Sequence, residues 1–171
     1  MFAPIHPHSY QTTQTIQPRL RRLEIEQRYE SDLVLQNTYT GRQLLLRLKE
    51  YATFGEDWDT YGAKPISPRA VAAARDLLFT VFAAFYDSGA PDGLSNPLAL
   101  PAIVTPSPDG AIHFVWQQGN RELAVDVYDM DAYAYLLVTP VQASDGMVHT
   151  YKEETVTSLA MMVANIRAFI R

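Results

Sequence analysis

Three stretches of the chain repeat apolar residues every three or four positions, which is the spacing of an amphipathic helix. They cover residues 40–51, 67–88 and 155–170. Ser67 followed by Pro68 is typical of a helix start, because serine accepts a free amide hydrogen of the first turn and proline fixes φ. The residues predicted to face the core are Leu44, Leu45, Leu48, Tyr51 and Ala52; Val71, Ala74, Leu78, Val81, Phe82 and Phe85; and Leu159, Met162, Val163, Ile166 and Phe169.

Between residues 102 and 139 the pattern changes to alternating apolar and polar residues, which is typical of antiparallel strands. We expect two-residue turns at Asp109-Gly110, Gly119-Asn120 and Asp129-Met130. Turns of that length pair Ile103 with Trp116; Trp116 with Leu123, Phe114 with Val125, Ile112 with Val127 and His113 with Asp126; and Val125 with Ala134 and Leu123 with Leu136. This register puts Phe114 and Trp116 on the core face of the sheet.

Together these elements predict an α+β fold with an antiparallel meander of four strands and helices packed on one face. A further strand near 147–151 would extend the meander to five. Residues 1–30 are expected to form an extended N-terminal arm and residues 31–171 a single domain, because Pro4, Pro7 and Pro18 interrupt a polar segment with few apolar residues. Within the arm, residues 19–30 fit either a short amphipathic helix or an edge strand.

Composition narrows the class of protein further. The chain has 171 residues, of which 47% are hydrophobic, so it can form one well-packed domain. It contains no cysteine, which excludes disulfides, thiolate zinc sites and a cysteine nucleophile. The N-terminal residues lack the pattern of a secretory signal, and the apolar stretch near 70–85 is interrupted by polar residues, so we expect a cytoplasmic protein without a membrane span.

The formal charge of −5 is unevenly distributed. Residues 1–70 carry nine basic and eight acidic side chains, whereas residues 71–171 carry five and eleven. This argues against attraction of the whole protein to nucleic acid or anionic membrane. A nucleic-acid contact would have to use the one basic cluster, Arg19, Arg21, Arg22 and Arg28, but Glu24, Glu26 and Glu30 interleave with it and cancel most of its field.

The predicted loop at 55–67 is unusually rich in aromatic and acidic residues. Trp58, Asp59 and Tyr61 could form a recognition surface or a pocket in which aromatic walls flank a carboxylate. The alternative is structural: Trp58 and Tyr61 fill the edge of the core, Asp59 accepts bonds from backbone amides, and Gly62 makes a tight turn.

The outer face of the predicted sheet is the second candidate. The expected register places His113, Asp126, Tyr128, Tyr133 and Tyr135 there. An aspartate beside a histidine orients the imidazole and raises its basicity, as a general base requires, but such pairs also occur as ordinary cross-strand contacts. Asp126, Asp129 and Asp131 lack the spacing of a calcium loop, and His6 and His8 have no further ligand nearby, so we expect no metal and no cofactor.

Part of the sequence resembles a protein family. The run WDTYGAKPIS, a predicted helix, and then IVTPSPDGAIHFVW are similar to a group of uncharacterised bacterial and phage proteins that share a W-D-x-Y-G-A-x-P stretch, a helix and a P-D-G hairpin. The resemblance covers about residues 55–130. It implies a bacterial or phage origin and brings neither an activity nor catalytic residues.

The sequence contains no P-loop, G-x-G-x-x-G, H-E-x-x-H or G-x-S-x-G motif. We therefore expect a non-enzymatic adaptor or accessory subunit of a bacterial complex, which binds another protein or further copies of itself. Its partner-binding candidates are Trp58, Asp59, Tyr61, His113, Asp126, Tyr128, Tyr133 and Tyr135. Two alternatives stay open: a small enzyme with a pocket at the Trp58 loop or at the His113–Asp126 pair, and a nucleic-acid-binding protein that uses Arg19, Arg21, Arg22 and Arg28.

Overall fold

The computed structural model describes residues 16–87, 89, 96–129, 132–144 and 146–171, and the side chains from residue 25 onward. It contains helices α1 (Ile16–Asn37), α2 (Tyr39–Tyr51), α3 (Pro68–Ala84) and α4 (Leu159–Ile170), and a short 3-10 helix, η1 (Pro97–Ala99). The strands are β1 (Ile103–Pro106), β2 (Ile112–Gln118), β3 (Arg121–Val127), β4 (Tyr133–Ala143) and β5 (Gly146–Val156). They form one antiparallel sheet in the order β1-β2-β3-β4-β5, which confirms the predicted α+β meander.

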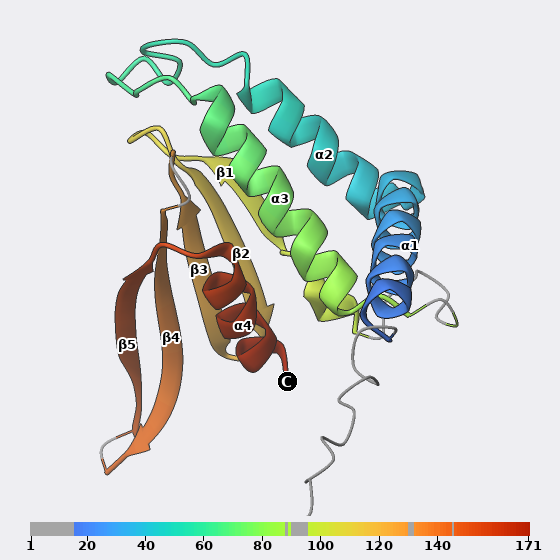
Figure 1. Cartoon of the computed structure of the whole chain (residues 1–171). Helices are drawn as coiled ribbons and strands as arrows, with labels where there is room; N and C mark the ends of the chain where they lie inside the picture. Colours follow the sequence, from blue (N-terminus) through green and yellow to red (C-terminus); the bar gives the residue numbers. More distant parts are fainter. Residues whose placement is uncertain (1–15, 88, 90–95, 130–131, 145) are drawn as a thin grey trace, which may run out of the picture.

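The helices lie on one side of the sheet (Figure 1). Helix α3 packs on β2 and β3, α4 contacts α3 and β5, and α2 contacts α3 and β1. The core lies between these layers, and its largest fully buried side chains include Trp116, Tyr133, Phe82 and Phe114. Two of its large polar side chains are hydrogen-bonded to the backbone: the Tyr51 hydroxyl donates to the Val104 carbonyl at 2.8 Å, and the Trp116 indole donates to the Ala99 carbonyl at 3.1 Å.

Helix starts follow local chemistry. The Ser67 hydroxyl accepts a hydrogen bond from the Ala70 amide at 3.0 Å, and Pro68 occupies the first turn, as predicted. Thr38 caps α2 in the same way through the Gly41 amide at 3.1 Å. Gly41 is required there, because a Cβ at this position would overlap the Leu35 carbonyl.

The structure resolves the choice between helix and strand that the sequence pattern left open for residues 19–30. Residues 19–30, which fitted either a helix or an edge strand, belong to α1, and α1 runs without a break through residue 30. The part of the expected arm that precedes Ile16 lies outside the described residues.

The predicted register is correct for one hairpin and wrong for two. Strands β2 and β3 pair as expected, with His113 opposite Asp126 and Trp116 opposite Leu123. In β1–β2, however, Ile103 lies opposite Val115, and in β3–β4, Leu123 lies opposite Leu137. Both connections have three residues instead of two: the Ser107 amide bonds to the Ala111 carbonyl, and the Tyr128 amide bonds to the Ala132 carbonyl.

A shift of one residue exchanges the two faces of a strand. Val104 therefore faces the core instead of Ile103. Tyr133 and Tyr135, expected on the outer face, are buried in the core, so their assignment to an exposed surface is wrong.

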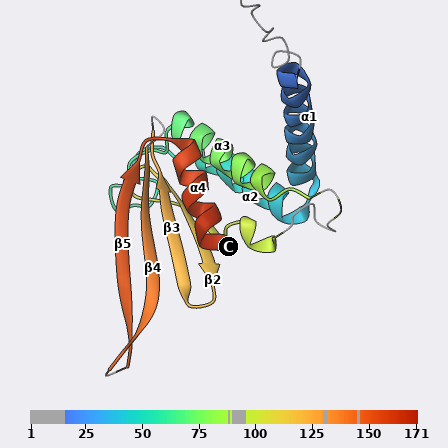
Figure 2. The same cartoon turned by 60° about the horizontal axis from the view of Figure 1, so that its bottom comes forward.

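The C-terminal region also differs in its boundaries. The strand expected near 147–151 is present but extends to Val156, so the last helix begins at Leu159 instead of Thr155. Strand β3 pairs with β4 only as far as Val138, which leaves residues 139–143 of β4 and 146–150 of β5 as a two-stranded ribbon. Figures 1 and 2 show this ribbon extending beyond the rest of the sheet. Within the described part of the chain, no helix has the length and hydropathy needed to cross a membrane.

Candidate functional site

The loop between α2 and α3 packs its tryptophan against the core. The half-buried Trp58 ring lies 5.1 Å from the Phe54 ring, which lies 5.6 Å from the ring of Tyr51 (centroid distances). The Trp58 indole donates a hydrogen bond to the Lys64 carbonyl at 3.0 Å. Trp58 thus extends the aromatic core to the surface, which agrees with its structural interpretation. Tyr61 does not fill the edge of the core, as that interpretation expects, because 92% of its surface is exposed.

The carboxylates of this loop bind its own backbone. One oxygen of Asp59 accepts hydrogen bonds from the amides of Tyr61, at 2.8 Å, and Ala63, at 3.1 Å. Asp57 accepts one from the Gly62 amide at 2.7 Å and has a φ of 55°. These bonds hold a tight loop, as the structural interpretation expects, and they engage one oxygen of each of these two carboxylates.

The outer face of the sheet carries the His113–Asp126 pair. The imidazole Nδ1 lies 2.7 Å from a carboxylate oxygen of Asp126 on the neighbouring strand. The hydrogen bond to Asp126 raises the pKa of His113 above 6.5, although partial burial opposes the shift. About a third of each side chain is exposed. The pair is therefore a solvent-accessible cross-strand contact whose histidine gains protons more readily than usual.

A second polar pair lies at the same end of the sheet. The Tyr128 hydroxyl donates to Asp109 at 2.8 Å, so it ties the start of the β3–β4 connection to the β1–β2 turn. Burial and this hydrogen bond raise the pKa of Tyr128 to about 12. Burial alone would raise the pKa of Asp109, but hydrogen bonds from Ser107, Tyr128 and the backbone outweigh it and lower that pKa. Neither group is poised to exchange a proton near neutral pH.

A row of apolar side chains runs across the outer face next to the His113–Asp126 pair. Ile103, Val115, Ala124 and Leu136 are successive register partners on β1, β2, β3 and β4. Ile103 is 41% exposed and Leu136 is partly exposed, whereas Val115 and Ala124 between them are buried. His113 and Asp126 flank the row on one side, and Gln117 and Glu122 flank it on the other, where their side chains hydrogen-bond at 3.3 Å.

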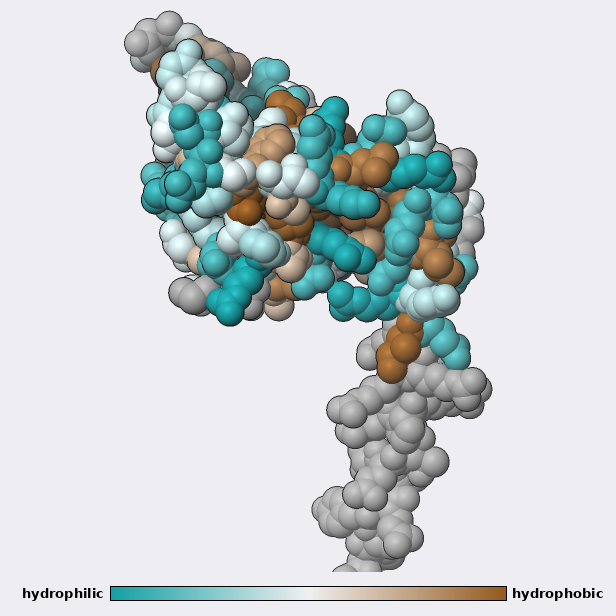
Figure 3. Space-filling view, turned by 90° about the horizontal axis from the view of Figure 1, so that it is seen from above, coloured by the Kyte–Doolittle hydropathy of each residue, from teal (hydrophilic) through white to brown (hydrophobic). Residues whose placement is uncertain are grey.

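Sequence reasoning missed this row because two hairpins were assigned the wrong turn length. With three-residue turns, the same alternation assigns Ile103, Val115, Ala124 and Leu136 to one face. Other exposed apolar residues lie on the helices: Tyr39, Leu46 and Met161 lie singly, and Ile25, Tyr29 and Leu33 recur every four residues along α1. Figure 3 shows one side of the molecule, where brown hydrophobic atoms lie in separate places among teal hydrophilic ones. The row is distinguished from them by its continuity across four strands.

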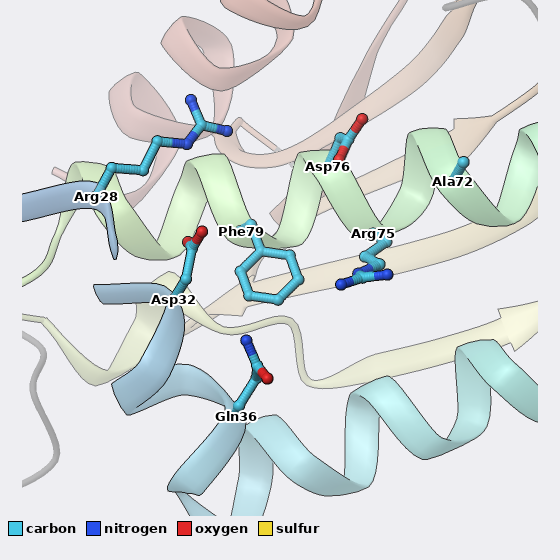
Figure 4. Close-up of a pocket in the computed structure, with 7 residues that line it drawn as sticks. All are labelled: Arg28, Asp32, Gln36, Ala72, Arg75, Asp76 and Phe79. Carbon is cyan, nitrogen blue, oxygen red and sulfur yellow. The ribbon is translucent and has the colours of Figure 1, made fainter. Parts of the chain in front are cut away.

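A cavity of about 230 Å³ lies between α1 and α3 (Figure 4). It is lined by Arg28, Asp32, Gln36, Ala72, Arg75, Asp76 and Phe79. The Arg75 guanidinium lies 5.3 Å from the centre of the Phe79 ring. Burial raises the pKa of Asp32, although Arg28 and Arg75 oppose the shift. Two arginines face two aspartates here, so the charges of the cavity compensate one another.

A second cavity, of about 200 Å³, lies between α4 and the strands β3, β4 and β5. Its basic side chains are already bonded. Arg121 donates to the Gln118 side chain at 3.0 Å and lies 4.9 Å from the Phe169 ring centre, and Lys152 pairs with Glu154 at 3.0 Å. Neither cavity is lined by Trp58, Asp59, Tyr61, His113 or Asp126, so the residues of the enzyme alternative do not meet in either of them.

The remaining candidates give little additional chemistry. Arg19, Arg21 and Arg22 lie on α1, but their side chains are not among those described, and Arg28 is exposed and lines the first cavity. His6, His8 and Asp131 lie outside the described residues. Within the described ranges, no three His, Cys, Asp or Glu side chains are grouped so that they could hold a metal ion.

The comparisons with known proteins add no relative from which a role could be inferred: the chain matches no protein-family model, no curated protein and no solved structure.

Proposed function

We propose that this protein is a non-enzymatic protein-binding component, an adaptor or accessory subunit, and that it binds its partner with the outer face of its sheet. The observation that carries the proposal is the apolar row Ile103–Val115–Ala124–Leu136 with its polar flanks. When only one face of an antiparallel sheet packs on helices, the other face is normally polar. A continuous apolar row on the free face is instead typical of an interaction surface.

The layout of this face also resembles a protein interface. Interfaces have an apolar centre and a polar rim in which water-accessible groups set specificity. Here Ile103 and Leu136 supply the exposed apolar area, Val115 and Ala124 lie buried between them, and the pairs His113–Asp126 and Gln117–Glu122 lie on either side. The rim is mostly acidic or amide-bearing, so we expect a partner surface with exposed apolar residues bordered by basic ones.

The polar groups favour binding over catalysis. Asp57 and Asp59 each engage one carboxylate oxygen in hydrogen bonds from backbone amides, and His113 has no described nucleophile bonded to it. On the resemblance of residues 55–130 to bacterial and phage proteins, we extend the proposal to a partner within a bacterial complex. The Trp58 loop presents Tyr61 as a further contact, since that side chain is almost fully exposed.

The proposal is tested by placing a charge at the centre of the row. Ala124→Lys introduces an ammonium group between Val115 and Leu136, at a position that is not part of the core cluster. Tagged wild type and variant are expressed in the native host, and copurifying proteins are quantified by mass spectrometry. We expect at least one specific protein to be retained by the wild type and reduced about tenfold or more by Ala124→Lys.

The matched control is Leu46→Lys, which adds the same charge at an exposed position of α2. It should retain the partner at the wild-type level, and circular dichroism should show both variants folded. If the same proteins copurify with all three chains, or none copurifies with any, the outer face is not a partner-binding surface.

A further inference from the structure

Strand β5 is a long edge strand with no strand beyond it in the described part of the sheet (Figure 1). It has 11 residues and pairs with β4 along its whole length in a single register, without a bulge. Nine successive residues, 147–155, are exposed, so neither face of most of the strand is covered. The other edge differs: β1 has only four residues and contacts α2.

An edge of this kind attracts another strand. Its unpaired N–H and C=O groups form a template, and monomeric proteins usually protect such edges with short strands, proline, bulges or charged side chains, lysine above all. Strand β5 has no proline and no bulge, and two of its three charged side chains, Lys152 and Glu154, pair with each other at 3.0 Å. It also exposes Met147, Val148 and Tyr151, which favour pairing with an apolar or aromatic neighbour.

The pairing with β4 determines which residues are free to bond. Ala143 and Gly146 pair directly across a two-residue connection, so they exchange hydrogen bonds with each other. Hydrogen-bonded and non-bonded pairs alternate along an antiparallel ladder. Even-numbered residues of β5 therefore bond to β4, and the odd-numbered residues from 147 to 155 direct their backbone groups to the free edge.

We propose that two copies of this chain pair through β5, antiparallel, about a two-fold axis that passes Tyr151. This forms one continuous ten-stranded sheet. A closed two-fold dimer is the commonest assembly of identical chains, and here one strand supplies both halves of the interface. Five odd-numbered residues on each copy then form about ten backbone hydrogen bonds between the chains.

Charge and overlap select this register among those that the free backbone groups allow. With Tyr151 on the axis, the strand overlaps itself over its full length, and Glu153 lies opposite His149 of the second copy. With Glu153 on the axis, only residues 150–156 overlap and two carboxylates face each other, which is unfavourable. With His149 on the axis, only residues 146–152 overlap, and Glu153 and Glu154 lie outside the pairing.

The dimer does not depend on the partner that binds the outer face, but it doubles the number of apolar rows that one assembly presents. Antiparallel edge pairing keeps the two outer faces on the same side of the continuous sheet, so each dimer presents two copies of the apolar row. A partner that itself has two binding sites would then bind more tightly through avidity.

The first measurement is the mass of the purified protein by light scattering after size exclusion, at chain concentrations from about 1 to about 200 µM. We expect about 38 kDa, twice the 19.2 kDa chain, at the upper end of this range. Ala124→Lys should leave this mass unchanged, so loss of the outer-face partner and loss of the dimer are separate results. A mass of one chain at every concentration overturns the proposal.

Tyr151→Pro tests the edge directly. Its amide points to the free edge, so proline should leave the β4–β5 ladder intact but block pairing with a second copy. We expect the dissociation constant of the dimer to rise about tenfold or more. Tyr151→Thr keeps the amide and the strand preference and should change it much less. A dimer that is equally stable with Tyr151→Pro forms through another surface.

Cross-linking tests the register and does not depend on the proline variant folding. The chain has no cysteine, so Tyr151→Cys introduces a single thiol, and the proposed axis places it beside the same thiol of the second copy. We expect rapid cross-linking with a short bis-maleimide. Tyr61→Cys lies on the loop between α2 and α3 and is more exposed than Tyr151, 92% against 67%, but it should cross-link slowly because the proposed dimer does not bring two copies of it together. Equal rates for the two variants would contradict pairing about Tyr151.

Discussion

The two faces of this sheet are formed by the same strands but differ in what covers them: the inner face packs on helices, and the outer face packs on none that the structure describes. On the inner face, Phe114, Trp116 and Tyr133 are fully buried, and the Trp116 indole finds a carbonyl partner. On the outer face, the side chains between them form a thin apolar row with His113 and Asp126 beside it. The inner face is thus filled by large side chains that stabilise the domain, whereas the outer face keeps small and medium ones that leave room for another surface.

Hydrophobicity alone therefore does not determine whether a strand residue lies in the core. Tyr133 carries a hydroxyl and is buried, whereas Ile103 is purely aliphatic and 41% exposed. The pairing register makes the decision, because every residue of a strand takes its face from the alignment of the whole strand.

The largest expected contrast between the faces is in stability. Leu123→Ala removes a core side chain that is 2% exposed and should lower the free energy of unfolding by about 2–5 kcal/mol. Leu136→Ala makes the same change on the outer face and should cost less than about 1 kcal/mol, because that residue is partly exposed and can relax. Urea denaturation measures both. Equal losses would mean that the outer face is as much a core as the inner one.

A smaller effect is expected at the turn that sets the β1–β2 register. Gly110 has a φ of 93°, and a Cβ there would lie 3.1 Å from the Pro65 carbonyl. Gly110→Ala should therefore cost about 1–2 kcal/mol. Gly55→Ala, where a Cβ would meet no atom within 4 Å, is the control and should be nearly neutral. If Gly110→Ala were equally neutral, the three-residue turn would not require a left-handed residue.

The smallest effect concerns the outer-face histidine. Its pKa is raised above 6.5 in the folded chain, so the His113–Asp126 pair stabilises the fold fully below about pH 6.5, and this contribution is lost as the pH rises through the raised value. NMR titration should show His113 titrating above 6.5 in the wild type and lower in Asp126→Asn.

Stability should follow the same trend. The difference between wild type and Asp126→Asn should be larger at about pH 5.5 than at about pH 8.5 and should stay below about 1 kcal/mol, because the pair is solvent-screened. With His113→Gln the pH trend of that difference should disappear. A His113 pKa that is the same with and without Asp126 would show that the pair does not couple.

Much of the fold could be predicted from local patterns. Ser67-Pro68 predicted the start of α3, the apolar spacing predicted most of the buried residues of α2, α3 and α4, and Gly119-Asn120 predicted the β2–β3 register. These features depend on residues near one another in the sequence, where capping chemistry and turn length act directly. The His113–Asp126 contact was predictable for the same reason. Ala52, expected to face the core, is instead exposed beyond the end of α2.

The outer-face row and the free edge were decided only by the tertiary structure. The sequences at Asp109-Gly110 and at Asp129 fit turns of either two or three residues. At the first turn the structure has three residues, and Gly110 there lies close to Lys64 and Pro65 of the loop before α3. Strand β5 carries mostly exposed, polar residues, so its length cannot be predicted from an alternation of apolar and polar positions. It forms because each of its residues has a register partner on β4. Local chemistry therefore determined the elements, and long-range backbone pairing determined which surfaces they leave for a partner.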